Sequence, residues 1–296
     1  MGKLVIIDGN AILHRAFHAL PPLTTKRGEP INAVYGLISM LLRVIADLKP
    51  TNLIVCFDRP EPTFRHKAFA SYQAQRPKTA TELTSQFEKA KRVITAFGIP
   101  IYEKAGFEAD DVIGTIAGKA DGDVIIVTGD RDQLQLVNEK VKVYMPVGGL
   151  ANAKLMGEEE VKAKMGVPPK LIDDYKALVG DPSDNYPGVT GIGPKTALKL
   201  LNEFGSLDNI YDSLDKIPKV VSQKLKVGTK QARLSKKLAT IVRDVPLEIN
   251  LEDSGKWDLD SQAALLLFNE YGFKTLTERI KKVGKEMDLE KQAVLF

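Results

Sequence analysis

The sequence predicts an α/β domain with a mostly parallel sheet, followed by a helical module. In the first half, short apolar runs alternate with helical patterns, as in a parallel sheet flanked by helices. From about residue 168 the strand-like runs end, and short helices separated by Gly and Pro follow. We therefore expect two domains, residues 1–167 and 168–280, and a flexible charged tail over 281–296.

The individual elements follow from the spacing of apolar residues. Strands are expected at 3–7, 52–57, 100–103, 123–128 and 141–144. Helices are expected at 34–48, 81–97 and 110–120, and in the second half at 169–179, 194–204, 206–214, 230–242 and 261–271. A polar, basic stretch over 59–81 interrupts this pattern, and insertions of that length are usually functional or disordered.

Composition excludes several classes of protein. The chain has 296 residues, of which 44% are hydrophobic and 27% charged, as in ordinary globular proteins. It contains no apolar run of the roughly 20 residues that cross a bilayer, and its start reads as a strand and not as a signal peptide. The single Cys56 excludes an internal disulfide and a zinc site built from cysteines. We expect a cytoplasmic protein.

The net charge of +4 conceals an asymmetry. Residues 216–243 contain nine Lys or Arg residues and no acid, so the remainder holds 33 basic and 38 acidic residues, a net charge of −5. We call residues 216–243 the basic tract. A solvated surface could carry such a tract, but its length without an acid favours contact with a polyanion.

Carboxylates follow three of the expected strands and open one of the helices. The candidates are Asp8, Asp58, Glu108, Asp110, Asp111, Asp130, Asp132, Asp181 and Asp184. Because the carboxyl ends of parallel strands meet at one edge of the sheet, we expect most of these side chains to converge. Helix capping would explain Asp110 or Asp111 alone. The whole set would repel itself unless cations neutralise it.

This basin favours a metal-dependent reaction. Oxygen ligands without His or Cys indicate Mg²⁺ or Mn²⁺. Two such ions about 4 Å apart suit the in-line displacement of a phosphoryl group, so phosphodiester hydrolysis is the leading reaction class. Neither a Ser–His–Asp arrangement nor a P-loop competes with it. His14 and His18 are four residues apart but lack a third ligand, so we interpret them as ordinary helix residues.

A glycine-rich turn over residues 187–197 leads into a helix. Gly191 and Gly193 allow close approach of a partner, and the free N–H groups of the following helix can bind a phosphate. A plain helix–helix turn has the same pattern. Followed by Lys195 and the basic tract, the turn indicates a helix–hairpin–helix that holds a duplex backbone without reading its bases.

Together these motifs resemble one family, the bacterial 5′-nucleases, meaning the 5′–3′ exonuclease domain of DNA polymerase I and its flap-endonuclease relatives. The resemblance covers about residues 3–280. The matching segments are 6–10, 15–20, 28–30, 33–36, 57–58, 63–65, 108–111, 128–132, 180–188 and 191–197. It implies a PIN-like (resolvase-like) nuclease domain, a helical arch at about 64–90 and a C-terminal helix–hairpin–helix (H3TH) module.

The resemblance also implies roles. It implies a structure-specific nuclease that removes 5′ flaps and RNA primers from branched duplex DNA in replication and repair, leaving 5′-phosphates. Asp8, Asp58, Glu108, Asp110 and Asp111 would serve mainly a first Mg²⁺ or Mn²⁺, and Asp130, Asp132, Asp181 and Asp184 mainly a second. The hairpin around 189–193 would hold a K⁺ ion. The expected DNA contacts are Arg15, Tyr72, Gly191, Gly193, Lys195, Thr196, Lys224 and Lys226.

The arch departs from the family pattern Tyr-Lys-x-x-Arg. Here Tyr72 is followed by Gln73, and Arg76 completes the pattern. The missing lysine leaves open which cation steadies the scissile phosphate. We nominate Arg65 and Arg76 as catalytic residues, with Lys67 as an alternative.

Two other functions remain open at this point: a catalytically impaired accessory protein that binds flap DNA, and a PIN-type ribonuclease. Loss of second-site aspartates would favour the first, but all are present, and the second would not need the hairpin module.

Gln292, Leu295 and Phe296 resemble the peptide by which bacterial replication proteins dock on the sliding clamp. Chance, or a cut through a longer polymerase, would give the same ending. We expect a free-standing, monomeric nuclease associated with the nucleoid.

Overall fold

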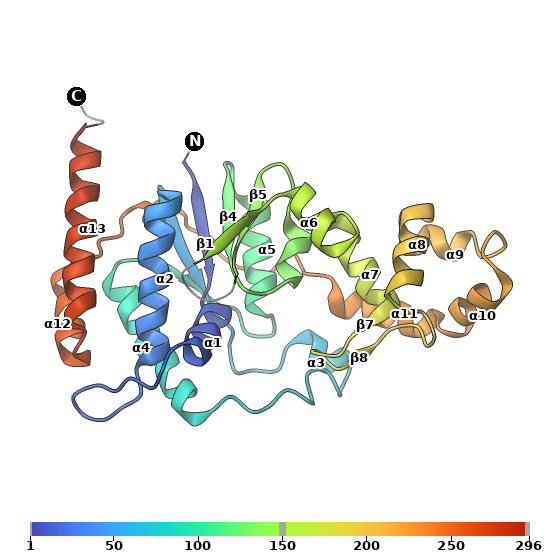
Figure 1. Cartoon of the computed structure of the whole chain (residues 1–296), viewed down its shortest axis with the longest axis horizontal. Coiled ribbons are helices and arrows are strands. Elements are labelled where there is room, and N and C mark those ends of the chain that lie inside the picture. The colour runs from blue at the N-terminus through green and yellow to red at the C-terminus, as the bar shows by residue number, and fades with distance from the viewer. Residues whose placement is uncertain (1, 148–151, 294–296) are drawn as a thin grey trace.

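The computed structural model describes residues 2–147 and 152–293, with side chains to residue 286. Its α/β part is built on a six-stranded sheet (Figure 1). In sheet order the strands are β3 (Ile101–Tyr102), β2 (Asn52–Cys56), β1 (Leu4–Asp8), β4 (Val124–Val127), β5 (Val141–Pro146) and β6 (Ala153–Met156). All neighbours are parallel except β5 and β6. The predicted parallel sheet is confirmed, and β6 is an antiparallel edge strand that the sequence analysis missed.

Helices cover both faces of the sheet. Leu4 and Ile6 of β1 join an apolar core with α5 (Ala109–Lys119), whereas Val5 and Ile7 join a second core. The helices of that second core include α1 (Gly9–Ala19), α2 (Asn32–Leu48) and α4 (Thr81–Ala96). Because successive side chains of a strand point to opposite faces, a strand buried on both sides reads as a continuous apolar run.

A helical module lies at one end of the molecule (Figure 1). After α6 (Glu158–Met165), it consists of α7 (Ile172–Val179), α8 (Pro194–Phe204), α9 (Leu207–Asp212), α10 (Lys219–Val227) and α11 (Thr229–Ala239). A small antiparallel ribbon, β7 (Gly180–Asp181) and β8 (Tyr186–Pro187), follows α7. Ile172 and Leu225 belong to the same core as Val112 of α5, so the module packs on that side of the sheet.

The last two helices leave this module. In Figure 1, α12 (Gln262–Tyr271) and α13 (Lys274–Ala293) lie at the opposite end of the molecule, beside α4 and α2. Phe268, Leu276 and Ile280 are buried in the same core as Leu37 of α2. The expected unit 168–280 is therefore divided, because the apolar residues of α12 and α13 complete the core on the α2 side of the sheet.

The tail also differs from the expectation. We expected residues 281–296 to be flexible, but α13 continues to Ala293. Ile280 anchors the helix, and Lys282 and Glu286 form an i,i+4 ion pair of 3.9 Å, a pairing that supports exposed helices. Gln292 lies in α13, whereas Leu295 and Phe296 lie outside the described residues. No helix among the described residues is long and apolar enough to cross a membrane.

The expected arch, at about residues 64–90, begins with the short helix α3 (Phe64–Ala68), continues as turns and irregular backbone, and ends within α4. This segment contacts the turn of the β7–β8 ribbon. The N–H of Gln73 donates to the Asp184 carbonyl at 2.9 Å, and Asn185 Nδ2 donates to the Ser71 carbonyl at 2.7 Å. Residues far apart in sequence thus meet above the sheet edge.

Candidate active site

A cleft of about 710 Å³ lies at the carboxyl edge of the sheet. The predicted ligands that line it are Asp8, Asp58, Glu108, Asp110, Asp130, Asp132 and Asp184. The convergence expected from parallel strand ends is therefore present. These carboxylates divide into two groups that differ in what neutralises them.

Asp8 belongs to the first group. It ends β1 and caps α1, so the strand–helix junction fixes its position. Its carboxylate accepts hydrogen bonds from Ala11 N at 2.9 Å and Thr128 Oγ1 at 2.7 Å. Burial, reinforced by the charges of Asp58 and Asp130, raises the pKa of Asp8 to about 7 despite these donors.

Asp58, Glu108 and Asp110 complete the first group. Asp58 Oδ1 accepts the N–H of Ala109 at 2.6 Å, which ties the end of β2 to the start of α5. Gln133 Nε2 donates to Asp110 Oδ1 at 2.7 Å. Burial raises the pKa of Glu108 to about 7, and burial with neighbouring carboxylates raises the pKa of Asp110 well above its ordinary value. Crowded carboxylates with raised pKa values are the setting in which divalent cations bind well.

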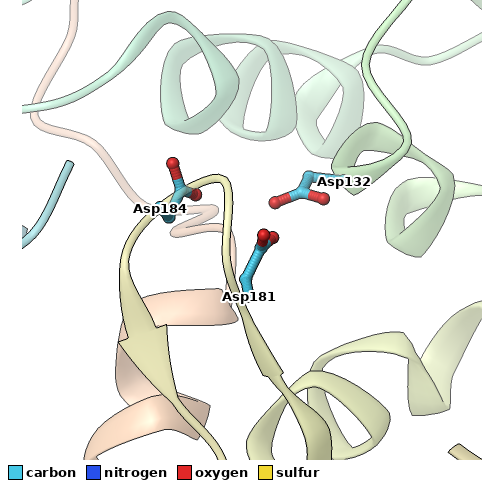
Figure 2. Close-up of side chains that lie close together, drawn as sticks. All are labelled: Asp132, Asp181 and Asp184. Atoms are coloured by element: carbon cyan, nitrogen blue, oxygen red, sulfur yellow. The ribbon is translucent and has the colours of Figure 1, made fainter. Parts of the chain in front are cut away.

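Asp132, Asp181 and Asp184 form the second group. Each offers an oxygen atom within 4.8 Å of the others. Figure 2 shows that they converge from two segments: Asp132 opens the 3₁₀ helix η1 (Asp132–Leu136), while Asp181 and Asp184 flank the turn of the β7–β8 ribbon. This all-carboxylate donor set fits Mg²⁺ or Mn²⁺.

Asp130 lies between the two groups. Its Oδ1 accepts the N–H of Asp132 at 2.8 Å. Its charge also acts on Asp8, Asp58 and Asp110 of the first group. The resemblance assigned Asp130 mainly to the second ion, whereas this placement puts it beside both.

Two cations contact the second group. Lys176 of α7 donates to both Asp132 and Asp181, with 2.5 Å to Asp181 Oδ2. Arg76 Nη2 donates to Asp184 Oδ1 at 2.5 Å. Although burial opposes the effect, Lys176 holds the pKa of Asp181 below its ordinary value. Burial dominates at Asp132, whose pKa is raised to about 6.

The structure gives Asp111 and Arg65 a mutual contact that the predicted roles did not include. Asp111 is fully buried, and Arg65 Nη1 and Nη2 donate to its two carboxylate oxygens at 2.7 and 2.8 Å. Arg65 Nε donates to the Leu238 carbonyl at 2.9 Å, and Nη2 also donates to the Thr240 carbonyl at 3.1 Å. Both Asp111 oxygens thus accept from Arg65, and Asp111 Oδ1 also accepts from Val242 N at 2.9 Å. The Arg65 guanidinium joins α3 to the end of α11, and although Arg65 lines the cleft, only 3% of its side chain is exposed.

The arch contributes two further side chains to the cleft. The Tyr72 hydroxyl lies 3.3 Å from Glu108 Oε2 and 3.4 Å from Asp184 Oδ2, so it bridges the two carboxylate groups. Tyr72 is buried and stacks on Tyr186. Arg76 keeps half of its side chain exposed, and Lys67 is exposed on α3. Of these two nominated cations, only Arg76 lines the cleft.

Sequence reasoning missed Lys176 and two glutamines. Gln133 donates a hydrogen bond to Asp110. Gln135 joins η1 to the helical module, because its side chain accepts from Ile241 N at 2.9 Å and donates to the Ala239 carbonyl at 3.0 Å. A usable signal for Lys176 was its place five residues before Asp181, in an otherwise apolar stretch at the end of a helix.

The predicted nucleic-acid residues lie mostly at the hairpin before α8. Gly191 has φ of 79°, which a residue with a side chain rarely adopts, and Gly193 is the N-cap of α8. Lys195 is exposed and Thr196 half-buried in the first turn of α8. Lys224 Nζ donates to the Gly191 carbonyl at 3.1 Å, so α10 packs beside the hairpin.

The basic tract is only partly available to a partner. Lys236 pairs with the buried Asp174 at 2.6 Å, and Arg233 pairs with Asp208. The exposed lysines of the tract are Lys216, Lys219, Lys224, Lys226, Lys230 and Lys237. Arg15 lies apart from them on α1, with its guanidinium beside Gly129 at the sheet edge.

Comparison with known sequences finds two adjoining family models. The 5′-3′ exonuclease N-terminal resolvase-like domain matches residues 3–166, and the 5′-3′ exonuclease C-terminal SAM fold matches residues 167–262. DNA polymerase I of Bacillus caldotenax is 42% identical over 291 residues, which is 96% of this chain and 33% of that protein. DNA polymerase I of Bacillus subtilis is 39% identical over 97% of this chain and 33% of its own length. The chain thus spans about a third of these relatives.

Solved structures share the fold. The bacteriophage T5 D15 protein crystallised with metal ions has a TM-score of 0.65 at 18% identity, covering 96% of this chain and 98% of that one. Flap endonuclease-1 from Methanococcus jannaschii has a TM-score of 0.60 at 18% identity, covering 98% of this chain and 94% of its own. With both family models matched in order along one acidic cleft and one hairpin module, the chain belongs to the 5′-3′ exonuclease family.

Proposed function

We propose that the chain is a metal-dependent, structure-specific 5′-nuclease that hydrolyses DNA phosphodiesters near 5′ ends and flaps. The observation that carries this proposal is the cleft in which carboxylates from the sheet edge and from the β7–β8 ribbon face each other. Membership of the 5′-3′ exonuclease family supports the same reaction. Neither alternative, an impaired accessory protein or a PIN-type ribonuclease, gains a specific observation.

In this proposal some residues hold the metal ions, and another residue orients the phosphate. Two bound Mg²⁺ or Mn²⁺ ions would supply activation of the attacking water and stabilisation of charge on the phosphate. The first group, with Asp130, would hold one ion, and Asp132, Asp181 and Asp184 the other. Arg76 is the exposed cation that would orient the scissile phosphate at the mouth of the cleft.

The helical module would hold the duplex that follows the flap. The N–H groups that open α8 and the exposed Lys195, Lys224 and Lys226 suit backbone phosphates. We place a K⁺ ion on the carbonyls of residues 189–193, where Lys224 already contacts the Gly191 oxygen. RNA primers and 5′ flaps are the proposed substrates.

A cleavage assay tests this function. A labelled double-flap DNA and a single-stranded RNA are incubated with the protein and Mg²⁺, with and without EDTA. We expect EDTA-sensitive release of the DNA flap with a 5′-phosphate on the product. Cleavage of the RNA alone would support the ribonuclease, and tight flap binding without cleavage would support the accessory protein.

The dependence of binding on salt tests the DNA interface. Replacing Lys195, Lys224 and Lys226 together by Ala should lower the slope of log K against log salt by about one for each phosphate that a lysine no longer neutralises. The matched control replaces Lys274, Lys281 and Lys282, which are exposed on α13 at the other end of the molecule. An equal change in both variants would contradict the proposed interface.

Three finer assignments complete the proposal. The protein would act as a monomer in the cytoplasm, associated with the nucleoid. The segment from Gln292 to Phe296 would dock on the bacterial sliding clamp. Binding of the purified clamp to the intact chain, and its loss when residues 292–296 are removed, tests this assignment, and flap cleavage in the absence of clamp should be the same for both forms.

A further inference from the structure

Lys176 lies where a second divalent ion would bind. Its ammonium group donates to Asp132 and to Asp181, two of the three carboxylates that converge in Figure 2. Lys176 is 9% exposed and comes from α7, immediately before the β7–β8 ribbon. The ammonium is therefore held inside the second group of carboxylates, not at its rim.

We propose that Lys176 is an internal competitor of the second ion, which can bind only when the ammonium is displaced from Asp132 and Asp181. The ammonium lies between Asp132 and Asp181, where an ion shared by these two carboxylates would bind, and two cations so close repel each other strongly in a low-dielectric site. The second site should therefore fill at a higher metal concentration than the first. This inference rests on the two-ion function proposed above.

The first group of carboxylates has different hydrogen-bond donors, and this difference should make it bind its metal ion before the second group does. Its carboxylates Asp8, Asp58 and Asp110 are held by backbone amides, a hydroxyl and a side-chain amide, which are neutral donors. Glu108, the fourth member, lies 3.5 Å from Arg65 Nη1, and that guanidinium is already bonded to Asp111. An ion that enters beside Asp8, Asp58 and Asp110 displaces no side-chain cation from these three carboxylates. An ion entering the second group must first break the hydrogen bonds of Lys176.

The displaced ammonium has a nearby acceptor. The Tyr186 hydroxyl is buried and lacks a hydrogen-bond partner among the described residues. Tyr186 pairs with Asp181 directly across the β7–β8 ribbon, so the two side chains lie on the same face of the ribbon. The flexible four-carbon side chain of lysine allows its charge to shift without movement of the backbone. Tyr186 is the group we expect to receive Lys176 when the ion binds.

Metal binding to the full chain without DNA tests the proposal. Mn²⁺ is titrated into the wild type, Lys176→Met and Lys236→Met, and free Mn²⁺ is followed by electron paramagnetic resonance. Lys236 is the matched control, because it pairs with a buried aspartate, Asp174, in the same module but away from the three clustered carboxylates. We expect one tight and one weaker site in the wild type and in Lys236→Met. In Lys176→Met the weaker Kd should fall about tenfold or more, while the tight Kd stays unchanged.

Thermal unfolding supplies a second readout. In EDTA, Lys176→Met should unfold at a lower temperature than the wild type, because Asp132, Asp181 and Asp184 lose a cation, and Mn²⁺ should raise its midpoint by more than it raises that of the wild type. If Lys176→Met does not fold, Lys176→Gln replaces it in both measurements. A weaker Kd that is the same with and without the lysine would overturn the proposal, as would the binding of a single ion by every variant.

The outcomes separate this inference from the proposed function. Flap cleavage together with an unchanged weaker Kd in Lys176→Met would leave the nuclease in place and remove the competitor. Tighter binding of the second ion in Lys176→Met, without flap cleavage by the wild type, would keep the competitor and remove the nuclease.

Discussion

The two groups of carboxylates at the cleft are alike in composition, but their aspartates differ in what surrounds them. Asp8, Asp58 and Asp110 receive hydrogen bonds from neutral donors, and burial raises the pKa of Asp8 to about 7. Asp181 and Asp184 are contacted by Lys176 and Arg76, and the pKa of Asp181 is held low. Two sites built from the same residue types therefore differ in the charge that an entering metal ion meets.

The difference follows from where each group lies in the fold. The first group is built on the ends of β1 and β2 and the start of α5, where peptide N–H groups are the available donors. The second is assembled from η1, the β7–β8 ribbon, α7 and the arch, and those segments bring charged side chains with them. The sheet edge thus supplies a fixed site, whereas the second site depends on the docking of the β7–β8 ribbon, α7 and the arch beside η1.

The largest expected effect is on cleavage, at the two aspartates where the groups meet. Asp130→Ala and Asp132→Ala should each lower the single-turnover rate on a labelled flap by about a thousandfold or more, because loss of an ion removes several kcal/mol of transition-state stabilisation. Flap binding, measured by fluorescence anisotropy, should survive. Mn²⁺ titration sharpens the comparison: Asp132→Ala should lose the weaker site, and Asp130→Ala should weaken both.

Asp123→Ala is the control for these variants, since Asp123 is an exposed carboxylate just before the opposite end of β4. It should change neither rate nor binding. Equal loss of binding and turnover in Asp130→Ala or Asp132→Ala, accompanied by unfolding, would show that these residues maintain the fold and not the chemistry.

The second effect concerns Arg65, which is bonded to Asp111 and lies 3.5 Å from Glu108 of the first group. Arg65→Met should lower the free energy of unfolding by about 3–5 kcal/mol, because it leaves Asp111 buried without its cation. Urea denaturation measures this loss. Arg59→Met breaks an exposed ion pair with Glu61 and should cost at most about 1 kcal/mol. If Arg65 acts on the phosphate instead, Arg65→Met will keep its stability and lose only its rate.

The contact of Arg65 with Asp111 shows which parts of the site can be predicted from the sequence and which cannot. Apolar runs that end in Asp8, Asp58 and Asp130 predict a shared sheet edge, because the geometry of parallel strands leaves no other place for them. Asp110 and Asp111 are adjacent in sequence, yet one faces the cleft and the other a buried arginine. That distinction depends on residues 238–242, which the fold brings to α5 from far along the chain.

The same reason explains the missed counter-ion and the misplaced helices. The hydrogen bond of Lys176 with Asp132 joins segments 44 residues apart, and no local pattern encodes it. The apolar faces of α12 and α13 predict burial, but not against which neighbour, and they pack on α4 and α2 instead of the helical module. Local periodicity identifies elements, and tertiary contacts assign their partners.

The third effect is on the pH dependence of stability in EDTA. Asp8 has a pKa of about 7 in the fold and 3.8 as its ordinary value, so folding binds a proton between these values. Stability from this group is therefore present at low pH and is lost as the pH rises towards 7. Between pH 5.5 and 7.5, the wild type should lose about 2 kcal/mol more than Asp8→Asn. Urea denaturation at the two pH values measures the difference.

Metal provides the control for that prediction. A divalent ion binds the ionised carboxylate, so saturating Mg²⁺ should remove or reverse the loss seen in the wild type at the higher pH. A loss of equal size in Asp8→Asn would contradict the assignment of this effect to the first group and would point to carboxyls elsewhere.

The smallest effect tests the arch, which connects both groups through Tyr72 and carries Arg76 to the second. Arg76→Ala should lower the single-turnover rate by about tenfold, because a half-exposed cation near the reacting phosphate contributes less than an ion. Arg76→Lys, which keeps the charge, should recover part of that loss.

Gln73 lies three residues before Arg76 with φ of 56°, and its N–H is bonded to the Asp184 carbonyl, so its side chain starts from a position fixed beside the second group. Gln73→Lys should therefore be neutral or activating, because it adds a cation without disturbing Arg76 or Lys176. A silent Arg76→Ala together with a strongly activating Gln73→Lys would mean that Arg76 serves only to hold Asp184, and that the arch lacks the cation its phosphate needs.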